Sequence, residues 1–234
     1  MIYAIYGFIF GCLIHYLARR IGKLMPETTG YILLKLFIPT HYMPWEKLQN
    51  NPRYIYLFKR YLMRSLGWGI FTAAATCLFA LNFDIAYTWW YIAFLWILLL
   101  LVEIDKRFML LPDILTLPLL VLGFAYAAQS GPWLANPFIT YAQNSALGAI
   151  FGYVMPIVAS MFIVWKYPNA FGGGDIKLLC AIGAWLGPEI ISYVILGSCI
   201  IFATCCLINS QRIGPFGPAI VYATLIITTF LFGI

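Results

Sequence analysis

The chain has 234 residues, of which 63% are hydrophobic and only 9% are charged. A soluble domain carries roughly 25% charged residues, so this composition excludes a soluble enzyme, a coiled coil and a disordered chain. The aromatic content of 18% is typical of a membrane protein with aromatic belts at its interfaces. The net charge of +6 reflects a few unevenly placed basic residues and does not indicate nucleic-acid binding.

Apolar runs divide the chain into candidate membrane helices of the length that a bilayer requires, about 20 residues. They cover about 2–18, 66–82, 88–104, 114–129, 143–165, 176–187, 190–209 and 214–234. The run 176–187 is short for a span, so it either tilts or continues through Gly187-Pro188 into the next helix. The sequence therefore predicts an all-α polytopic membrane protein with about eight transmembrane helices.

The basic residues predict how these helices are oriented. Nine of the fourteen Lys and Arg lie in the polar stretch 19–65, which the positive-inside rule places in the cytoplasm. The N-terminus is then outside, and the loops that fall outside carry no Lys or Arg. The other five fall at predicted cytoplasmic helix ends: Lys106, Arg107, Lys166, Lys177 and Arg212. We expect residues 1–65 to form one span plus a cytoplasmic loop, and residues 66–234 to form a helical membrane domain.

The polar stretch contains four prolines and no cysteine. The prolines make one straight helix through this region unfavourable: Pro26, Pro39, Pro44 and Pro52. All six cysteines lie in apolar runs without a Cys-x-x-Cys pair, so we interpret them as packing residues and predict no metal site. A cleavable signal peptide is not expected, because the first apolar run has no basic residue before it and ends in Arg19-Arg20.

Four of the eight carboxylates lie at predicted cytoplasmic helix ends: Glu103, Asp105, Asp113 and Asp175. Ionisable residues at membrane depth are costly and often functional. A capping role for Asp105 is unfavourable at a helix C-terminus, so a salt bridge with Lys106 or Arg107 is the structural alternative. Asp113 follows Pro112, which can open the next helix, and this favours an N-cap or first-turn anion.

Asp175 follows three consecutive glycines, Gly172 to Gly174, and precedes Ile176-Lys177. Glycines permit unusual backbone conformations and close approach of another backbone. A phosphate loop is excluded, because no Gly-x-x-x-x-Gly-Lys-Ser/Thr is present and no strand precedes the glycines. A helix N-cap is the structural alternative for this aspartate.

Two aspartates from different helices at one depth predict an aspartyl dyad, with Asp105 and Asp175 as its members. Two nearby carboxylates share a proton, since both cannot ionise cheaply. One takes a proton from water as it attacks an amide carbonyl, and the protonated partner donates to the carbonyl oxygen and the leaving nitrogen. Zinc and serine mechanisms lack their motifs, since neither His-Glu-x-x-His nor Gly-x-Ser-x-Gly occurs.

The sequence resembles the type IV prepilin peptidases. Three segments carry the resemblance, in order: Ile104-Asp105 with Leu111-Pro-Asp-Ile-Leu-Thr-Leu-Pro-Leu-Leu120, Gly172-Gly-Gly-Asp-Ile-Lys-Leu-Leu179 with Gly183-Ala-Trp-Leu-Gly187, and Pro215-Phe-Gly-Pro218. The resemblance covers roughly residues 100–220 and implies an inner-membrane aspartyl endopeptidase. Such enzymes cut the basic leader from prepilins or pseudopilins at the cytoplasmic face, and Asp105 and Asp175 match their catalytic pair.

The resemblance also implies supporting motif residues: Glu103, Pro112, Asp113, Gly172, Gly174 and Lys177. Glu103, Asp113 and the two aspartates of the dyad are expected to attract the basic leader of the substrate. The apolar helix of the substrate lies in the bilayer. Bacterial members commonly bind zinc through two Cys-x-x-Cys pairs near the N-terminus and methylate the new pilin N-terminus. This chain lacks those cysteines, so no metal is expected, and S-adenosylmethionine is expected as a cofactor only if methylation is retained. The peptidase reaction is expected to need no cofactor.

Two other classes fit parts of the pattern. A polytopic transporter or channel with carboxylates in a broken-helix site would use the glycine-rich break before Asp175. An inactive scaffold of a pilus or secretion complex is the second alternative, and the presence of both aspartates counts against it. Mutation of either aspartate separates these alternatives from the peptidase.

Overall fold

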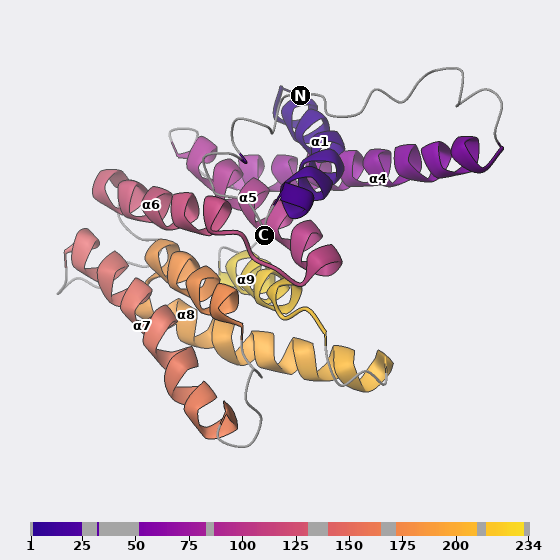
Figure 1. The fold of residues 1–234 in the computed structure, drawn as a ribbon. Helices are drawn as coiled ribbons and strands as arrows, with labels where there is room; N and C mark the ends of the chain where they lie inside the picture. Colours follow the sequence, from indigo (N-terminus) through magenta and orange to yellow (C-terminus); the bar gives the residue numbers. More distant parts are fainter. Residues whose placement is uncertain are drawn as a thin grey trace. The chain divides into compact units, whose positions relative to one another are not determined.

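The structure is a computed structural model that describes residues 2–24, 32, 52–82, 87–130, 140–164, 172–209 and 214–231. The elements in these ranges are all α-helices (Figure 1). They are α1 (Ile2–Leu24), α4 (Pro52–Asn82), α5 (Thr88–Phe108), α6 (Asp113–Ser130), α7 (Tyr141–Val164), α8 (Gly173–Asn209) and α9 (Gly217–Leu231). The predicted all-α class is therefore confirmed.

Five helices of the described part are long and apolar enough to cross a membrane: α1, α4, α5, α7 and α8. Two shorter apolar helices, α6 and α9, accompany them. The chain is thus a polytopic membrane protein, as its composition predicted. The number of spans and their orientation stay predictions.

The helices extend further into the polar stretch than predicted. The predicted loop over 19–65 is wrong at both ends, because α1 continues to Leu24 and α4 already begins at Pro52. Lys and Arg are good helix formers, so helical structure continues where the apolar run stops. Pro52 is the first residue of α4, a position where its missing N–H costs nothing. The predicted helix-breaking Pro26, Pro39 and Pro44 lie outside the described residues.

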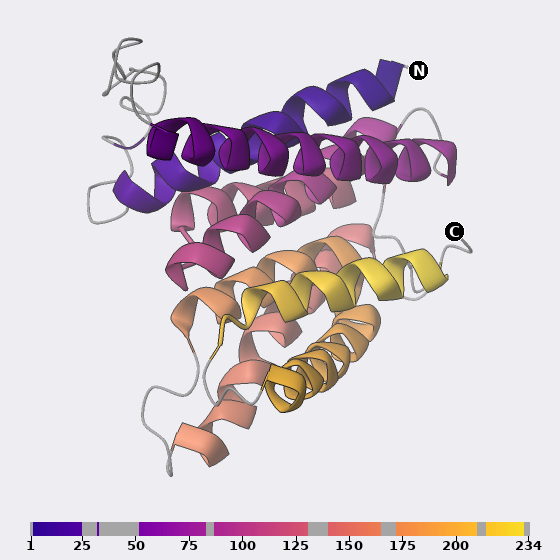
Figure 2. The ribbon, with the colours of Figure 1, turned by 90° about the vertical axis from the view of Figure 1, so that its right-hand side faces the viewer.

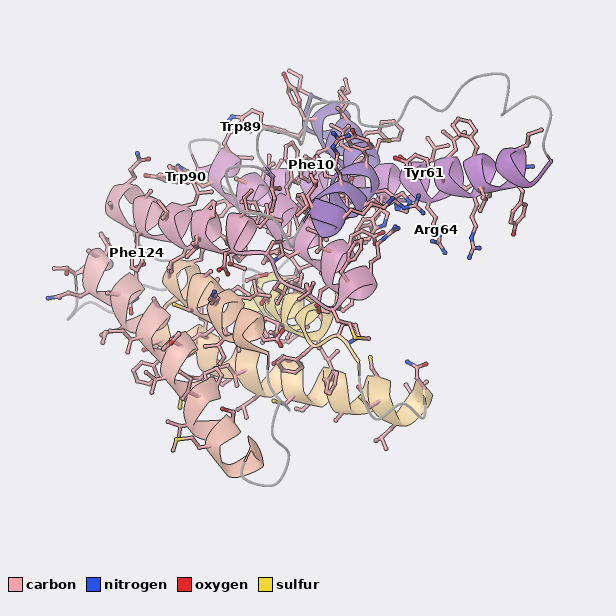
Figure 3. All side chains as sticks on the ribbon, viewed as in Figure 1. Phe10, Tyr61, Arg64, Trp89, Trp90 and Phe124 are labelled. Atoms are coloured by element: carbon pink, nitrogen blue, oxygen red, sulfur yellow. The ribbon has the colours of Figure 1, made fainter. Side chains whose placement is uncertain are left out.

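The chain forms two compact units, an N-terminal unit (Met1–Thr88) and a C-terminal unit (Trp89–Ile234). In the N-terminal unit α1 packs against α4 through glycines. A Cβ atom on Gly11 would collide with Thr72 Oγ1, and one on Gly7 would lie 2.9 Å from the Thr72 carbonyl oxygen. The Thr72 hydroxyl donates a hydrogen bond of 2.7 Å to the Gly7 carbonyl oxygen. Tyr61, labelled on α4 in Figure 3, packs on His15 of α1 with ring centroids 4.8 Å apart.

In the C-terminal unit α7 and α8 approach each other through small residues, and Figures 1 and 2 show them crossing. A Cβ atom on Gly148 or on Gly183 would collide with the backbone carbonyl of the other glycine. The Ser145 hydroxyl donates to the Ala184 carbonyl oxygen across the same contact, at 2.6 Å. Small residues of this kind let membrane helices approach closely, and here they fix the first half of α8.

Trp185 anchors that half of α8 to α5 and α6. Its side chain is fully buried, and its indole N–H donates to the Leu119 carbonyl oxygen at 2.8 Å. The indole stacks on Tyr126 of α6 with centroids 5.3 Å apart, and packs on Phe94 of α5 at 4.8 Å. Trp90, labelled at the start of α5 in Figure 3, lies 6.5 Å from the same indole. These contacts join the helices that carry Asp105 and Asp175.

A sharp kink divides α8 at Gly187-Pro188, so that the axes of its two halves point in different directions (Figure 2). Gly187 has φ 83° and ψ 173°, a conformation that is essentially restricted to glycine. Pro188 follows and begins the second half, where the missing N–H is tolerated. The run 176–187 thus continues through Gly187-Pro188 into the next helix, one of the two arrangements that the sequence allowed.

Candidate active site

Asp105 lies in the last turn of α5 and is almost fully buried, with 4% of its surface exposed. Its Oδ2 accepts a hydrogen bond of 2.9 Å from the backbone N–H of Gly217, the first residue of α9. Free N–H groups and the helix dipole make a helix N-terminus favourable for a carboxylate. The expectation that Asp105 is a poor cap is therefore wrong, because it caps another helix than its own.

The salt-bridge alternative for Asp105 is also not realised. Lys106 donates instead to the Tyr222 hydroxyl at 2.6 Å, and Arg107 donates to Glu103 at 2.7 Å. Glu103 is buried one helical turn before its partner, so its charge is compensated within α5. Neither Lys106 nor Arg107 thus pairs with the Asp105 carboxyl group, which accepts its hydrogen bond from Gly217.

Gly217 permits this contact because it has no side chain. A Cβ atom at this position would lie 2.7 Å from Asp105 Oδ2 and 3.1 Å from its Cγ. Sequence reasoning did not single out Gly217 as a site residue. The signal that could have found it is its place in the segment Pro215-Phe-Gly-Pro218, which resembles a family motif.

Asp175 lies in the first turn of α8. Its backbone N–H donates to the Gly172 carbonyl oxygen at 3.1 Å. The helix dipole favours a carboxylate in the first turn of a helix. The N-cap alternative is thus replaced by a related one, in which Asp175 stabilises the start of α8 from within its first turn.

Asp105 and Asp175, on α5 and α8, lie within electrostatic range of each other. Each carboxyl group also lies at the N-terminal end of a helix, α9 for Asp105 and α8 for Asp175. The fold therefore places both carboxylates at N-terminal helix ends, and the Gly217 N–H stabilises that of Asp105.

The three glycines before Asp175 have different surroundings. A Cβ atom on Gly174 would lie 2.9 Å from the Leu111 Cβ, in the segment between α5 and α6. A Cβ atom on Gly172 would lie 3.0 Å from the Asp175 carboxyl oxygen, whereas one on Gly173 would meet nothing within 4 Å. Gly174 thus brings the start of α8 against the segment that follows Asp105.

An ion pair also joins the two motifs. The Lys177 ammonium donates to both carboxyl oxygens of Asp113, at 2.7 and 2.8 Å. Asp113 is the first residue of α6, and the Pro112 carbonyl accepts the N–H groups of Leu115 and Thr116. Pro112 and Asp113 therefore open α6 as predicted. Because Arg107 and Lys177 neutralise Glu103 and Asp113, these two carboxylates add no net charge to attract a basic leader.

The described residues contain no group of three or more His, Cys, Asp and Glu side chains arranged to hold a metal ion. The six cysteines are all free thiols on described helices. His15 is buried in the N-terminal unit, and His41 lies outside the described residues.

The helices and the paired carboxylates define a multi-pass helical membrane protein with a two-aspartate site. A family model described as the type IV leader peptidase family matches residues 91–207, which is half of the chain. This chain belongs to the type IV leader peptidase family, as its motifs indicated. The match begins in α5 and ends in α8, so it includes both aspartates.

Curated relatives agree with this family. Each is called a prepilin leader peptidase/N-methyltransferase. The protein of Vibrio cholerae serotype O1 is 38% identical over 45% of this chain and 39% of its own length. That of Dichelobacter nodosus is 36% identical over 61% and 48%, and that of Pseudomonas aeruginosa is 36% identical over 55% and 44%. The chain therefore spans less than half the length of these relatives. No solved structure matches it.

Proposed function

We propose that this chain is a membrane aspartyl endopeptidase that cleaves the basic leader peptide from prepilins or pseudopilins. One observation carries this proposal. Asp105 and Asp175, far apart in sequence, lie within electrostatic range of each other, and both fall in the segment that matches the leader peptidase family. The relatives' names also describe prepilin leader peptidases.

The geometry suits water activation by two carboxylates. The Gly217 N–H holds Asp105 Oδ2, while Oδ1 has no hydrogen-bond partner among the residues that the structure describes. We assign Oδ1 to the attacking water, which gives up a proton as it adds to the amide carbonyl. The second carboxyl group, in its protonated form, donates to the carbonyl oxygen and then to the leaving nitrogen. Because the two groups interact, their titration belongs to the pair.

The charge distribution supports the proposed substrate and location. The N-terminal half of α4 carries basic side chains, among them Lys59, Arg60 and Arg64, and the positive-inside rule assigns such a region to the cytoplasm. We place the site at the cytoplasmic face of the inner membrane, with the substrate's leader in the cytoplasm and its apolar helix in the bilayer. The two aspartates themselves supply the negative charge that attracts a basic leader.

The transport alternative is not favoured. A broken-helix transport site would place its carboxylate at the interruption of a membrane helix. Asp175 instead lies in the first turn of α8, and the break in that helix occurs at Gly187. The aspartates meet at helix ends, which suits an enzyme acting where a substrate peptide meets the membrane.

Coexpression with a prepilin tests the peptidase proposal. We expect wild type to remove the leader, and Asp105→Asn and Asp175→Asn to leave the prepilin uncut, since asparagine cannot exchange the proton. Glu189→Gln is the matched control, because Glu189 is an exposed carboxylate on α8 outside the site. Normal cleavage by either aspartate variant, at equal protein level in the membrane, would contradict the dyad.

The relatives' names also include N-methyltransferase, and we propose methylation as a second reaction that the same experiment can measure. S-adenosylmethionine is the cofactor that this second reaction requires, whereas the peptidase reaction requires none. The mass of the mature pilin N-terminus separates the two outcomes, since cleavage removes the leader and methylation then adds one methyl group. A processed, unmethylated N-terminus in the presence of the cofactor would reject methylation alone.

A further inference from the structure

A pocket of about 290 Å³ lies within the C-terminal unit, between the end of α5, the end of α8 and the start of α9. Its walls are largely apolar and include Phe202 and Cys205 of α8 and Pro215 and Pro218 around the start of α9. Lys106 brings a positive charge to one wall. The pocket thus combines an apolar lining with a single described cationic group.

Among the described residues, no carboxylate pairs with the Lys106 ammonium. Its ammonium donates to the Tyr222 hydroxyl at 2.6 Å and lies 5.1 Å from the centre of that ring. An ammonium group has three donors, so two remain for a ligand. The other described cations of this unit, Arg107 and Lys177, each pair with a carboxylate. Lys106 is therefore the one described cation of the C-terminal unit without a carboxylate partner.

We propose that this pocket binds an anionic phospholipid of the surrounding bilayer. The phosphate would contact the Lys106 ammonium and the Tyr222 hydroxyl, and an acyl chain would lie along the wall formed by Phe202 and Cys205. Lipid reaches a pocket between the ends of membrane helices directly, and a lysine at a helix end sits at headgroup depth. Basic pockets between membrane helices are known to take anionic headgroups.

The pocket shares a wall with the candidate active site. Pro215 and Pro218 line the pocket, while Gly217 between them holds Asp105 through its N–H. A bound lipid therefore touches the segment that positions Asp105. Lipid binding itself does not depend on the proposed peptidase reaction, so it can be tested without a substrate.

Alkylation of the free cysteines tests the proposal on the purified full chain in a neutral detergent. Cys205 lines the pocket, and Cys199 is an exposed cysteine of the same helix outside the lining. We expect phosphatidylglycerol to slow maleimide labelling of Cys205 but not of Cys199. Phosphatidylcholine and inorganic phosphate at equal concentration are expected to leave both rates unchanged. Equal protection by phosphatidylcholine, or protection by phosphate alone, would overturn the proposal.

Variants identify the groups that bind. Lys106→Gln should weaken the protection by phosphatidylglycerol about tenfold, the effect of losing a hydrogen bond to a charged group. Lys59→Gln, which removes an exposed charge from α4, should leave it unchanged. Ile201→Trp should fill the pocket and abolish protection with Lys106 still in place. Full protection of Cys205 in both pocket variants would overturn the proposal. Protection of Cys205 by an acidic apolar peptide, with none by phosphatidylglycerol, would also overturn it.

Discussion

The two units of this protein use glycine for different purposes. In the N-terminal unit, Gly7 and Gly11 let α1 approach α4. In the C-terminal unit, Gly148 and Gly183 pack helices in the same way. Gly217, however, meets a carboxyl group rather than a helix. The comparison shows that a glycine can bring the backbone against a carboxyl group as well as against another helix.

Charge separates the two units as well. The described part of the N-terminal unit carries Lys and Arg but no Asp or Glu. The described part of the C-terminal unit carries five carboxylates, and two of them share a site. The family match lies within the second unit, at residues 91–207. The chemistry we propose therefore belongs to the C-terminal unit, and the following substitutions test that division.

Gly217→Ala is expected to have the largest effect among the glycine variants. Its Cβ atom would lie 2.7 Å from Asp105 Oδ2, so the carboxyl group must move. A displacement of this kind costs roughly a hundredfold in kcat with little change in KM, because the reacting group is misplaced and the substrate contacts remain. Steady-state kinetics on a purified prepilin measure both constants.

Gly197→Ala is the matched control for this variant, since its Cβ atom would make only ordinary contact, 3.4 Å from the Ala223 Cβ. Thermal unfolding of both variants separates misplacement from loss of folding. A normal kcat for Gly217→Ala would show that this amide does not position Asp105.

Gly174→Ala is expected to reduce cleavage about tenfold, since a small misplacement of a reacting group costs up to a hundredfold. The added methyl would lie 2.9 Å from the Leu111 Cβ, so the start of α8 must shift away from the segment between α5 and α6. Gly173→Ala adds the same methyl to open space and should cleave normally. Equal losses of cleavage in the two variants would mean that the three glycines act through backbone flexibility and not through the contact with Leu111.

Packing variants compare the two units directly. Gly11→Ala and Gly148→Ala each place a methyl group into a helix contact, and each should cost about 1–3 kcal/mol in the free energy of unfolding. We expect only Gly148→Ala to lower cleavage, by a few fold, because α8 carries Asp175. Denaturant titrations and a cleavage assay measure both effects. A loss of cleavage in Gly11→Ala as large as in Gly148→Ala would remove the functional division.

The ion pair between Lys177 and Asp113 should have the smallest effect. Both side chains are nearly half exposed, at 46% and 43%, so solvent screens their attraction. A double-mutant cycle with Lys177→Gln and Asp113→Asn should give a coupling of about 0.2–1 kcal/mol in the free energy of unfolding. Added salt should reduce it further. A salt-independent coupling above about 2 kcal/mol would contradict this expectation, because an exposed ion pair does not contribute that much.

Local patterns were sufficient to predict several features of the fold and the site. Asp105 and Asp175 stood out because charge is scarce in this chain, and the short run 176–187 indicated a helix that could continue through Gly187-Pro188, where α8 is kinked. The start of α4 was missed because apolar periodicity ends near residue 66, whereas helix formation continues to Pro52 through residues of good helix propensity.

Long-range contacts were not predictable in the same way. Gly217 holds Asp105 across 112 positions of the chain, and Trp185 reaches the Leu119 carbonyl across 66. No periodicity connects such pairs, because they depend on how helices pack rather than on how each helix forms. The resemblance of Pro215-Phe-Gly-Pro218 to a family motif marked the segment but not its partner.

The kinetic coupling of the two aspartates tests the central claim most directly. Residues that act as one unit are strongly non-additive, so removing the second costs little once the first is gone. Single-turnover cleavage of a prepilin should therefore be equally slow in Asp105→Asn, Asp175→Asn and the double variant, about a thousandfold or more below wild type. A double variant whose loss is the product of the two single losses would contradict a shared site.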